Sequence, residues 1–205
     1  MISEGSRPAG IHVVLEGWAC RYKTLRDGGR HIPALLLPGD FCDLQAAMLD
    51  RMDHGIAAIT PLRVACISQA QLAAFTAERP NIVLALQWAT LVDLSALRTW
   101  MVGLSGRSAL GRVAHLVCEL RDRSFNANAG DRNHFPFPLT QVELADATGQ
   151  TAVHANRIVS QLRSSRLADI RGGSVTILDG TALESVAEYD PAYLHLDQAA
   201  RADLI

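Results

Sequence analysis

The sequence predicts an α+β protein of 205 residues in which short strands are followed by helices. Three observations support this prediction. The first third of the chain alternates apolar and polar residues between Gly-containing turns, residues 81–102 contain neither Gly nor Pro, and two short helical patterns precede a Gly-Gly turn. We therefore expect an N-terminal sandwich or barrel, then a long helix, then a C-terminal helix-turn-helix with a β-hairpin.

The composition is that of a folded protein with almost balanced charge. Hydrophobic residues make up 49% of the chain and charged residues 20%, and the formal net charge is -2. A polybasic mode of nucleic-acid or membrane binding is therefore not expected, although a local basic patch is compatible with this total. No apolar run approaches the roughly 20 residues of a membrane span, and the N-terminus lacks a signal-peptide pattern. These features predict a cytoplasmic protein with no membrane partner.

The four cysteines give no sign of a zinc site or a thioredoxin-like site. None of them belongs to a C-x-x-C pair, the spacing typical of such sites. Cys20, Cys66 and Cys118 lie among apolar neighbours, where a free thiol packs like a small hydrophobic side chain. We expect these three as reduced thiols in the core, and we expect neither a metal nor a cofactor.

Turn signals divide the first third of the chain into short strands. The reversals are Glu16-Gly17, Asp27-Gly28-Gly29 and Pro38-Gly39-Asp40. Between the first two, Trp18, Cys20 and Tyr22 recur with the period of 2 that a half-buried strand requires. The predicted strands cover residues 11–15, 18–22, 31–37, 55–60 and 62–67.

A short helix capped by Ser68 is followed by a long helix over Asn81–Leu104 with apolar residues on two lines. The first line contains Leu84, Trp88 and Leu91. The second line contains Leu94, Leu97, Met101 and Leu104. A helix of this kind must be covered on more than one side. We expect one side to lie on the barrel and the other on a second copy of the chain; the alternative is a helix buried within one subunit.

The long helix is predicted to end at a hinge, Ser105-Gly106-Arg107. Helical periodicity resumes at Ala109 and fades near Ser124. The polar stretch at residues 126–131 then predicts a surface loop.

The segment from Leu139 to Ile177 contains the predicted helix-turn-helix. Thr140 and Glu143 fit a capping box, and Gly149 ends the first helix. Thr151 begins a second helix that continues through Arg163. Its expected buried stripe is Ala155, Ile158, Val159 and Leu162, and its opposite face consists of Ala152, Val153, Asn156, Arg157 and Ser160.

This opposite face has side chains suited to reading DNA. In a major groove Arg157 can donate a bidentate pair to guanine, Asn156 can bind adenine or phosphate, and Val153 can contact a thymine methyl group. Residues 170–177 predict a β-hairpin wing, from which Arg171 and Ser174 can contact phosphate. The candidate DNA-binding residues are Thr140, Gln141, Thr151, Ala152, Val153, His154, Asn156, Arg157, Arg171 and Ser174. The alternatives are a surface ion-pairing role for Arg157 and a solvent-facing or phosphate-contacting role for His154.

Four segments resemble the Crp/Fnr superfamily of bacterial transcription regulators. They are Pro38-Gly39-Asp40-Phe41, Gly111-Arg112-Val113-Ala114, Leu139-Thr140-Gln141-Val142-Glu143-Leu144-Ala145 and Thr151-Ala152-Val153-His154-Ala155-Asn156-Arg157. The resemblance implies a double-stranded β-helix (jelly-roll) sensor over residues 1–80, a dimerisation helix and hinge over 81–107, and a winged helix-turn-helix over 108–205. It also implies a regulator, not an enzyme, that binds palindromic double-stranded DNA as a homodimer and contacts RNA polymerase.

The departures from the family concern the effector and the DNA sequence. Members that bind cyclic AMP carry a Gly-Glu pair and an Arg-Ser pair. The first pair aligns here with Cys42-Asp43 and the second roughly with Asp53-His54. With Phe41 these residues form the candidate effector pocket, but Asp53 would repel a cyclic phosphate, so cyclic AMP is not the expected effector. Ala152-Val153 replace a polar pair of many relatives, which predicts a different DNA site. Compared with the family, the chain is also expected to lack the first helix and strands, and the clustered N-terminal cysteines of the iron-sulfur oxygen sensors are absent.

Two other functions remain open at this point. One is a regulator that works without a small-molecule effector, either constitutively or through a protein partner. The other is a cupin-like small-molecule-binding protein, although His12, His31 and His54 lack the clustered spacing of a metal site.

Overall fold

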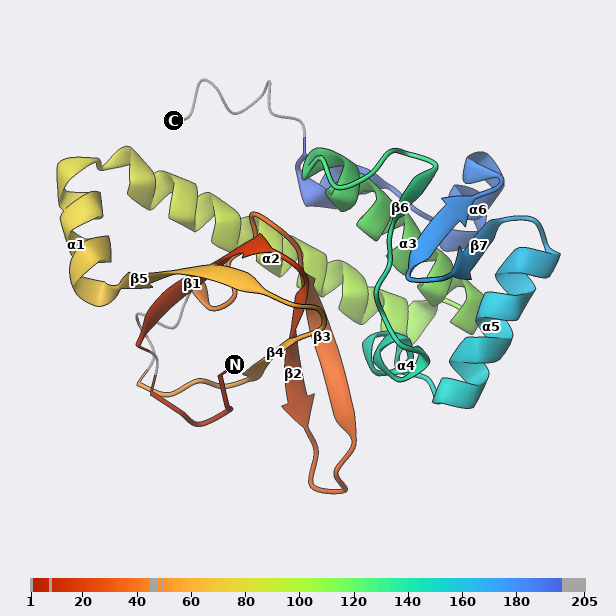
Figure 1. Ribbon diagram of the computed structural model, residues 1–205, viewed down its shortest axis with the longest axis horizontal. Coiled ribbons are helices and arrows are strands. Elements are labelled where there is room, and N and C mark those ends of the chain that lie inside the picture. Colours follow the sequence, from red (N-terminus) through yellow and green to blue (C-terminus); the bar gives the residue numbers. More distant parts are fainter. Residues whose placement is uncertain (1, 8, 45–47, 49, 197–205) are drawn as a thin grey trace. The chain divides into compact units, whose positions relative to one another are not determined.

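The computed structural model describes residues 2–7, 9–44, 48 and 50–196, and these group into two compact units. The first unit contains the described residues of 1–23, 34–98 and 192–205, and the second contains residues 24–33 and 99–191. Figure 1 shows the elements of both, with the strands β1–β5 first in the chain and most of the helices after them. The α+β class predicted from the sequence is confirmed.

The strands of the N-terminal part form two small antiparallel sheets. In one sheet β1 (Gly10–Glu16) pairs with β5 (Arg63–Ser68), and Val14 lies opposite Val64. In the other, β2 (Ala19–Thr24) lies between β3 (Arg30–Leu36) and β4 (Gly55–Ala58). Strand β4 ends earlier than predicted because the amides of Ile59 and Thr60 both donate to the carbonyl of Trp18 instead of continuing the ladder.

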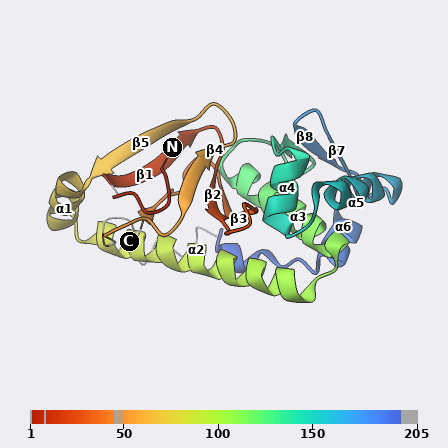
Figure 2. The ribbon, with the colours of Figure 1, turned by 90° about the horizontal axis from the view of Figure 1, so that it is seen from below.

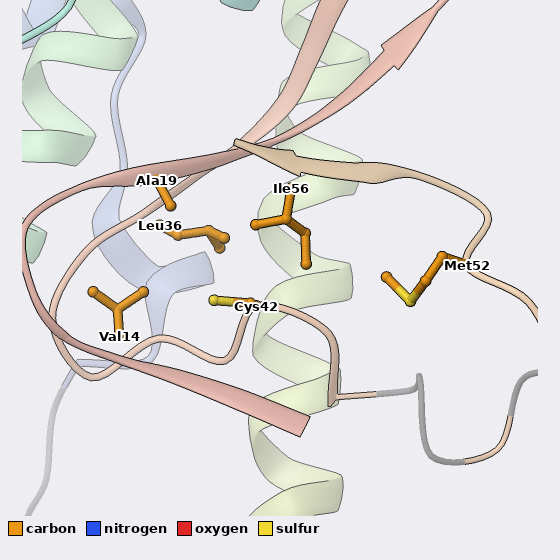
Figure 3. Close-up of a cluster of buried hydrophobic side chains, with 6 residues drawn as sticks. All are labelled: Val14, Ala19, Leu36, Cys42, Met52 and Ile56. Atoms are coloured by element: carbon orange, nitrogen blue, oxygen red, sulfur yellow. The ribbon is translucent and has the colours of Figure 1, made fainter. Parts of the chain in front are cut away.

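A cluster of buried side chains joins these strands to the loops between them. It consists of Val14, Ala19, Leu36, Cys42, Met52 and Ile56, which Figure 3 shows gathered together. Cys20 and Cys118 are buried and form no disulfide, as predicted, but Cys66 is exposed, so its placement in the core was wrong. The Cys66 side chain is exposed on β5. Cys42, for which no core role was predicted, is instead a member of the buried cluster.

The two helices that follow are α1 (Gln69–Glu78), which Ser68 caps, and α2 (Asn81–Gly106). The predicted hinge was wrong at two of its three residues, because Ser105 and Gly106 are helical. The Ser105 hydroxyl donates to carbonyls of the preceding turn, within the helix, and the next N-cap is Ser108. The helix break therefore falls at Arg107–Ser108, immediately before α3 (Ala109–Asn126).

Helix α2 is long and apolar enough to cross a membrane, as judged by length and composition alone. This helix was not singled out from the sequence as a candidate span, because the sequence contains no uninterrupted apolar run of roughly 20 residues. One such helix is weak evidence for a membrane protein. The most apolar 18-residue stretch of α2 has a mean hydropathy of 1.3, and it also contains Asp93 and Arg98. Many of the leucines of α2 are exposed.

The second unit is built around α3. This helix packs against α4 (Gln141–Thr148), α5 (Ala152–Ser164) and α6 (Gly180–Ala187). A three-stranded sheet, in the order β6-β8-β7, completes it with β6 (His134–Pro136), β7 (Ala168–Arg171) and β8 (Ser174–Ile177). The chain then continues into a short 3-10 helix at Pro191–Leu194, which belongs to the first unit from Ala192 onward. Figure 2 gives a second view of these elements.

Candidate nucleic-acid interface

The start and the end of α4 are both fixed by local chemistry. The Thr140 hydroxyl accepts from the Glu143 amide, and the Glu143 carboxylate accepts from the Thr140 amide at 2.8 Å, so the predicted capping box is present. Gly149 has φ 63°, the left-handed conformation that ends the helix. A Cβ at Gly149 would lie 2.8 Å from Cδ2 of Leu104, so glycine also permits this close approach. The capping box thus fixes where α4 begins, and Gly149 fixes the turn that leads into α5.

Helix α5 buries one side and exposes the other. Thr151 is its N-cap, and Ala155, Ile158 and Leu162 are buried, as predicted; Val159 is only partly buried. On the outer face the Val153 side chain is 83% exposed, and Asn156 and Arg157 are exposed as well. The outer face is thus free to contact a partner molecule.

Arg157 has a neighbour on this face that the sequence did not single out for the role. The Arg157 Nη2 group donates to His154 Nδ1 at 2.7 Å, one helical turn earlier. Across the part of the chain that the structure describes, Arg157 makes no ion pair with a carboxylate, so no neighbouring negative charge competes with DNA for its guanidinium. The i, i+3 spacing of the two residues was the signal that could have revealed this contact.

The hairpin of β7 and β8 places Arg171 and Ser174 on either side of its turn. Gly172 and Gly173 both have positive φ, as the predicted Gly-Gly turn requires. Arg171 pairs with Asp169 at 3.1 Å, and Asp169 also accepts from Arg163 at 2.7 Å. Arg171 is therefore partly neutralised, and a phosphate would have to compete with Asp169 for it. The Ser174 hydroxyl donates to the Arg171 carbonyl.

Polar residues of α3 support this unit from inside. Glu119 is fully buried, and its carboxylate accepts from Trp100 Nε1 at 2.7 Å and pairs with Arg123 at 3.0 Å. Asp122 accepts from Arg121 and from the Tyr189 hydroxyl. Burial first, and the nearby Asp122 charge second, raise the pKa of Tyr189 far above its usual range, so its hydroxyl stays protonated and donates. The sequence did not predict this network because two of its contacts, Trp100 with Glu119 and Tyr189 with Asp122, join residues 19 and 67 positions apart.

The candidate effector residues belong to the first unit and are held by internal contacts. Asp43 is buried and accepts from both the amide and Nδ1 of His12, the latter at 2.7 Å. Burial raises the pKa of the Cys42 thiol to about 12, so it remains un-ionised. Asp53 pairs with His54 at 2.7 Å. No group of three metal-ligating side chains occurs among the described residues.

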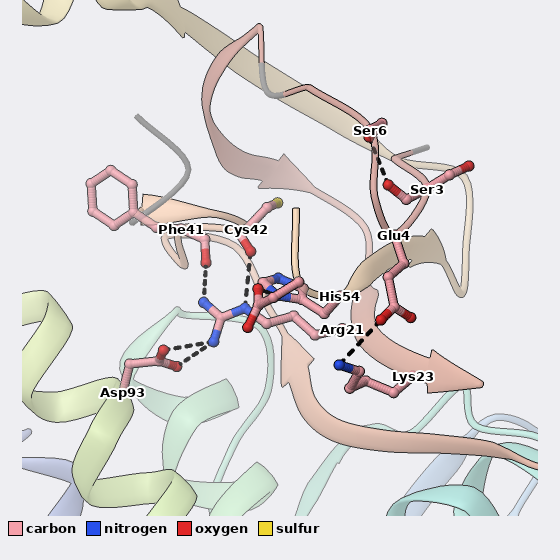
Figure 4. A network of polar contacts seen from close by, with 10 residues as sticks. Ser3, Glu4, Ser6, Arg21, Lys23, Phe41, Cys42, His54 and Asp93 are labelled. Atoms are coloured by element: carbon pink, nitrogen blue, oxygen red, sulfur yellow. Dashed lines mark hydrogen bonds and ion pairs between the residues drawn. The ribbon is translucent and has the colours of Figure 1, made fainter. Parts of the chain in front are cut away.

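Arg21 connects the segment at Phe41 and Cys42 to α2. Its guanidinium donates to the Phe41 and Cys42 carbonyls and forms an ion pair with Asp93 on the helix, at 2.6 Å (Figure 4). The two backbone carbonyls are therefore occupied by the protein itself. Arg21 was not among the predicted site residues, because its partners lie 20 to 72 positions away in the sequence.

Comparisons with known proteins match both parts of the chain to domains that occur in transcription regulators. Residues 1–79 match a family model described as a cyclic nucleotide-binding domain, and residues 111–186 match a Crp-like helix-turn-helix domain. The chain is 31% identical to the nitrogen fixation regulation protein FixK of Bradyrhizobium diazoefficiens, over 91% of this chain and 78% of that protein. It is 28% identical to the transcriptional activator protein FnrL of Cereibacter sphaeroides, over 84% and 70%.

Solved structures share the fold at lower identity. FixK2 from Bradyrhizobium japonicum superposes with a TM-score of 0.82 at 22% identity and covers 93% of both chains. A transcriptional regulator of the CRP family from Thermus thermophilus gives a TM-score of 0.74 at 19% identity, over 92% of this chain and 93% of that one.

Proposed function

Since the chain belongs to the Crp/Fnr family of transcription regulators, we propose that it binds a palindromic DNA site as a homodimer and inserts α5 of each subunit into the major groove. The single observation that carries this proposal is the outer face of α5, where Asn156 and Arg157 are exposed while Ala155, Ile158 and Leu162 are buried. A recognition helix needs this division between a packed side and a free side.

Each exposed group of α5 has a DNA partner of matching chemistry. The Arg157 guanidinium can donate to O6 and N7 of guanine, the Asn156 amide to adenine or a phosphate, and the Val153 methyl groups can contact a thymine methyl. Thr140, Gln141, Thr151, Arg171 and Ser174 would contribute phosphate contacts around this centre. His154 holds Arg157 through its Nδ1 atom, so we assign it a positioning role.

The second subunit is proposed to pack on α2. Leu94, Leu97, Met101 and Leu104 are all exposed, and their 3, 4, 3 spacing is that of a coiled-coil seam. A symmetric pair would present two copies of α5, and the family's mode of binding requires them about 34 Å apart, one turn of DNA. We also propose, from family membership, a cytoplasmic regulator that contacts RNA polymerase and has no enzymatic activity.

We propose that cyclic AMP is not the effector. The position where the family places a cation for the cyclic phosphate holds Asp53, which pairs with His54. Asp43 is buried against His12, and Arg21 already occupies the Phe41 and Cys42 carbonyls. Another small-molecule effector and an effector-independent regulator both remain compatible with these contacts.

A genome-wide map of bound sites tests the proposal. The expected result is a set of sites that share an inverted repeat, whose half-sites lie one helical turn apart, or roughly 10 base pairs. A map without a shared motif would contradict sequence-specific binding, and a motif with only one half-site would contradict the symmetric dimer.

A further inference from the structure

The second unit contains a small pocket where α2, α3 and α4 meet. Its lining includes Trp100, Leu104, Arg107, Arg112, His115 and Thr148. The space open to the centres of water molecules is about 30 Å³, which is room for roughly two waters. A nucleotide or a drug-sized ligand could not enter a space of this size, but a small anion could.

The two arginines of this pocket differ from the other arginines that the structure describes as partly or fully buried. Each of the others pairs with a carboxylate: Arg21 with Asp93, Arg30 with Asp146, Arg121 with Asp122 and Arg123 with Glu119. Over the described residues, no carboxylate lies within ion-pair distance of Arg107 or Arg112. Two like charges thus share one pocket without a counterion, although partly buried charges are ordinarily paired.

The protein itself uses only part of the hydrogen-bonding capacity of these two side chains. Arg107 donates through Nε to the Ala187 carbonyl and through Nη1 to the Thr99 carbonyl. Arg112 donates through Nε to the Thr148 carbonyl and through Nη1 to the Arg107 carbonyl. These acceptors are neutral, and the Nη2 groups of both residues lie outside all four bonds.

The remaining lining does not supply a negative charge. Burial, and then the charge of Arg107, lower the pKa of His115 to about 4, so His115 is neutral at pH 7. The Thr148 hydroxyl donates to the Leu144 carbonyl. Trp100 and Leu104 carry no charge, and the indole N–H of Trp100 already donates to Glu119.

We propose that this pocket binds a small oxyanion, a phosphate group or a carboxylate no larger than acetate, which Arg107 and Arg112 hold with their free guanidinium N–H groups. Arginine forms short, charge-assisted and often bidentate hydrogen bonds with such oxygens. The ligand would neutralise the two charges at the junction where Arg107 and Arg112 tie α2 and α3 to the last carbonyls of α4 and α6. This site does not depend on DNA binding.

Thermal unfolding of the full chain tests the site. Inorganic phosphate and acetate are titrated separately, with sodium chloride added to keep the ionic strength constant. At ten times the half-saturating concentration, a ligand that binds only the folded protein should raise Tm by about 3–6 °C. A saturable rise with either probe supports the site and tells which head group it accepts. No rise with either, or an equal rise with sodium chloride alone, overturns the proposal.

Two variants locate the effect. Arg112→Gln and Arg107→Gln each remove one charge, and each should abolish at least nine-tenths of the ligand-dependent rise. If one of them does not fold, the other still decides. The matched control is Arg166→Gln, an exposed arginine of the same unit, which should keep the full rise. An unchanged rise in a folded pocket variant would show that the anion binds elsewhere and would overturn the proposal.

Discussion

At the scale of single residues, the outer face of α5 depends on an arginine whose orientation comes from a histidine. Arg157 donates to His154 Nδ1 and has no carboxylate neighbour in the described structure, so nothing cancels its charge before DNA arrives. Val153 occupies the adjacent exposed position and offers no polar group. His154 is therefore the side chain that limits where the guanidinium can point.

We expect Arg157→Ala to weaken binding to the cognate site by about 1–3 kcal/mol, because a bidentate contact to guanine is lost. Binding to random DNA should change much less, since phosphate contacts remain. Fluorescence anisotropy with both DNAs at one salt concentration measures the two affinities. Arg166→Ala is the control, because Arg166 is exposed and lies just beyond α5. If the ratio of the two affinities is the same in Arg157→Ala as in the wild type, Arg157 does not read a base.

His115 makes the stability of the protein depend on pH. Burial, and then the charge of Arg107, lower its pKa from 6.5 to about 4 in the folded state. Between these values the unfolded chain binds more protons, so the free energy of unfolding falls as the pH drops from 6.5 towards 4. The loss at pH 5 relative to pH 7 is about 2 kcal/mol.

Urea unfolding of the wild type and of His115→Phe at pH 7 and pH 5 measures this effect. Phenylalanine keeps an aromatic ring against Tyr189, whose ring centroid lies 5.3 Å from that of His115. The variant should lose most of the extra destabilisation at pH 5. Equal pH dependence in both proteins would show that His115 is not the group responsible.

At the scale of elements, the end of α4 determines how α5 leaves the helix-turn-helix. Gly149 and Gly172 have nearly the same φ, 63° and 61°, but a Cβ would lie 2.8 Å from Leu104 at Gly149 and would meet nothing within 4 Å at Gly172. Alanine at either position costs about 1–2 kcal/mol for the left-handed backbone. Gly149→Ala should cost more than Gly172→Ala, because Leu104 must also move.

Urea midpoints of the two variants give this comparison directly. The difference between them isolates the contact with Leu104, since the backbone cost is shared. Equal destabilisation would mean that the Leu104 side chain rotates away at negligible cost. Gly149→Ala should in addition weaken DNA binding, whereas Gly172→Ala lies in the turn of the wing and tests the wing separately.

The elements that could be predicted from the sequence are those with strong local signals. The capping box at Thr140, the Gly149 terminus and the Gly172-Gly173 turn each depend on residues a few positions apart, and all three are present. Strand β6 was not predicted because it has only three residues, one of them a proline, which is too short for a periodic pattern. Helix α6 was not predicted because it begins at a glycine, Gly180, after the Asp179 cap.

The rest of the candidate sites depends on contacts that no local pattern reveals. The ion pair of Arg21 with Asp93 joins residues 72 positions apart, and the pocket at Arg107 and Arg112 needs the end of α4 to close it. Likewise, the sequence indicated a hinge at Ser105, but this residue bonds back into its own helix, and α2 continues to Gly106.

At the scale of the whole molecule, α2 is the element on which the proposed dimer depends. Leu97 is 47% exposed and Met101 64% exposed, on the line that also contains Leu94 and Leu104. We expect Leu97→Asp combined with Met101→Asp to dissociate the dimer, because each interface would bury four carboxylates without partners. Sedimentation should then give the mass of one chain, 22.2 kDa, and affinity for the palindrome should fall with it.

A matched pair on another side of the same helix decides which face is the interface. It combines Leu91 of the first line with Val102, which lies on the same side as Leu91 by helical periodicity. Leu91 and Val102 are exposed to a similar degree, 57% and 58%, but point away from the Leu97 line by about a third of a helical turn. Leu91→Asp combined with Val102→Asp adds the same charge to the same helix, and this variant should remain a dimer. If the Leu91 and Val102 variant dissociates while the Leu97 and Met101 variant stays dimeric, the subunits meet through the side of α2 that carries Leu91. The two copies of α5 would then be presented to DNA by a different pairing of the α2 helices.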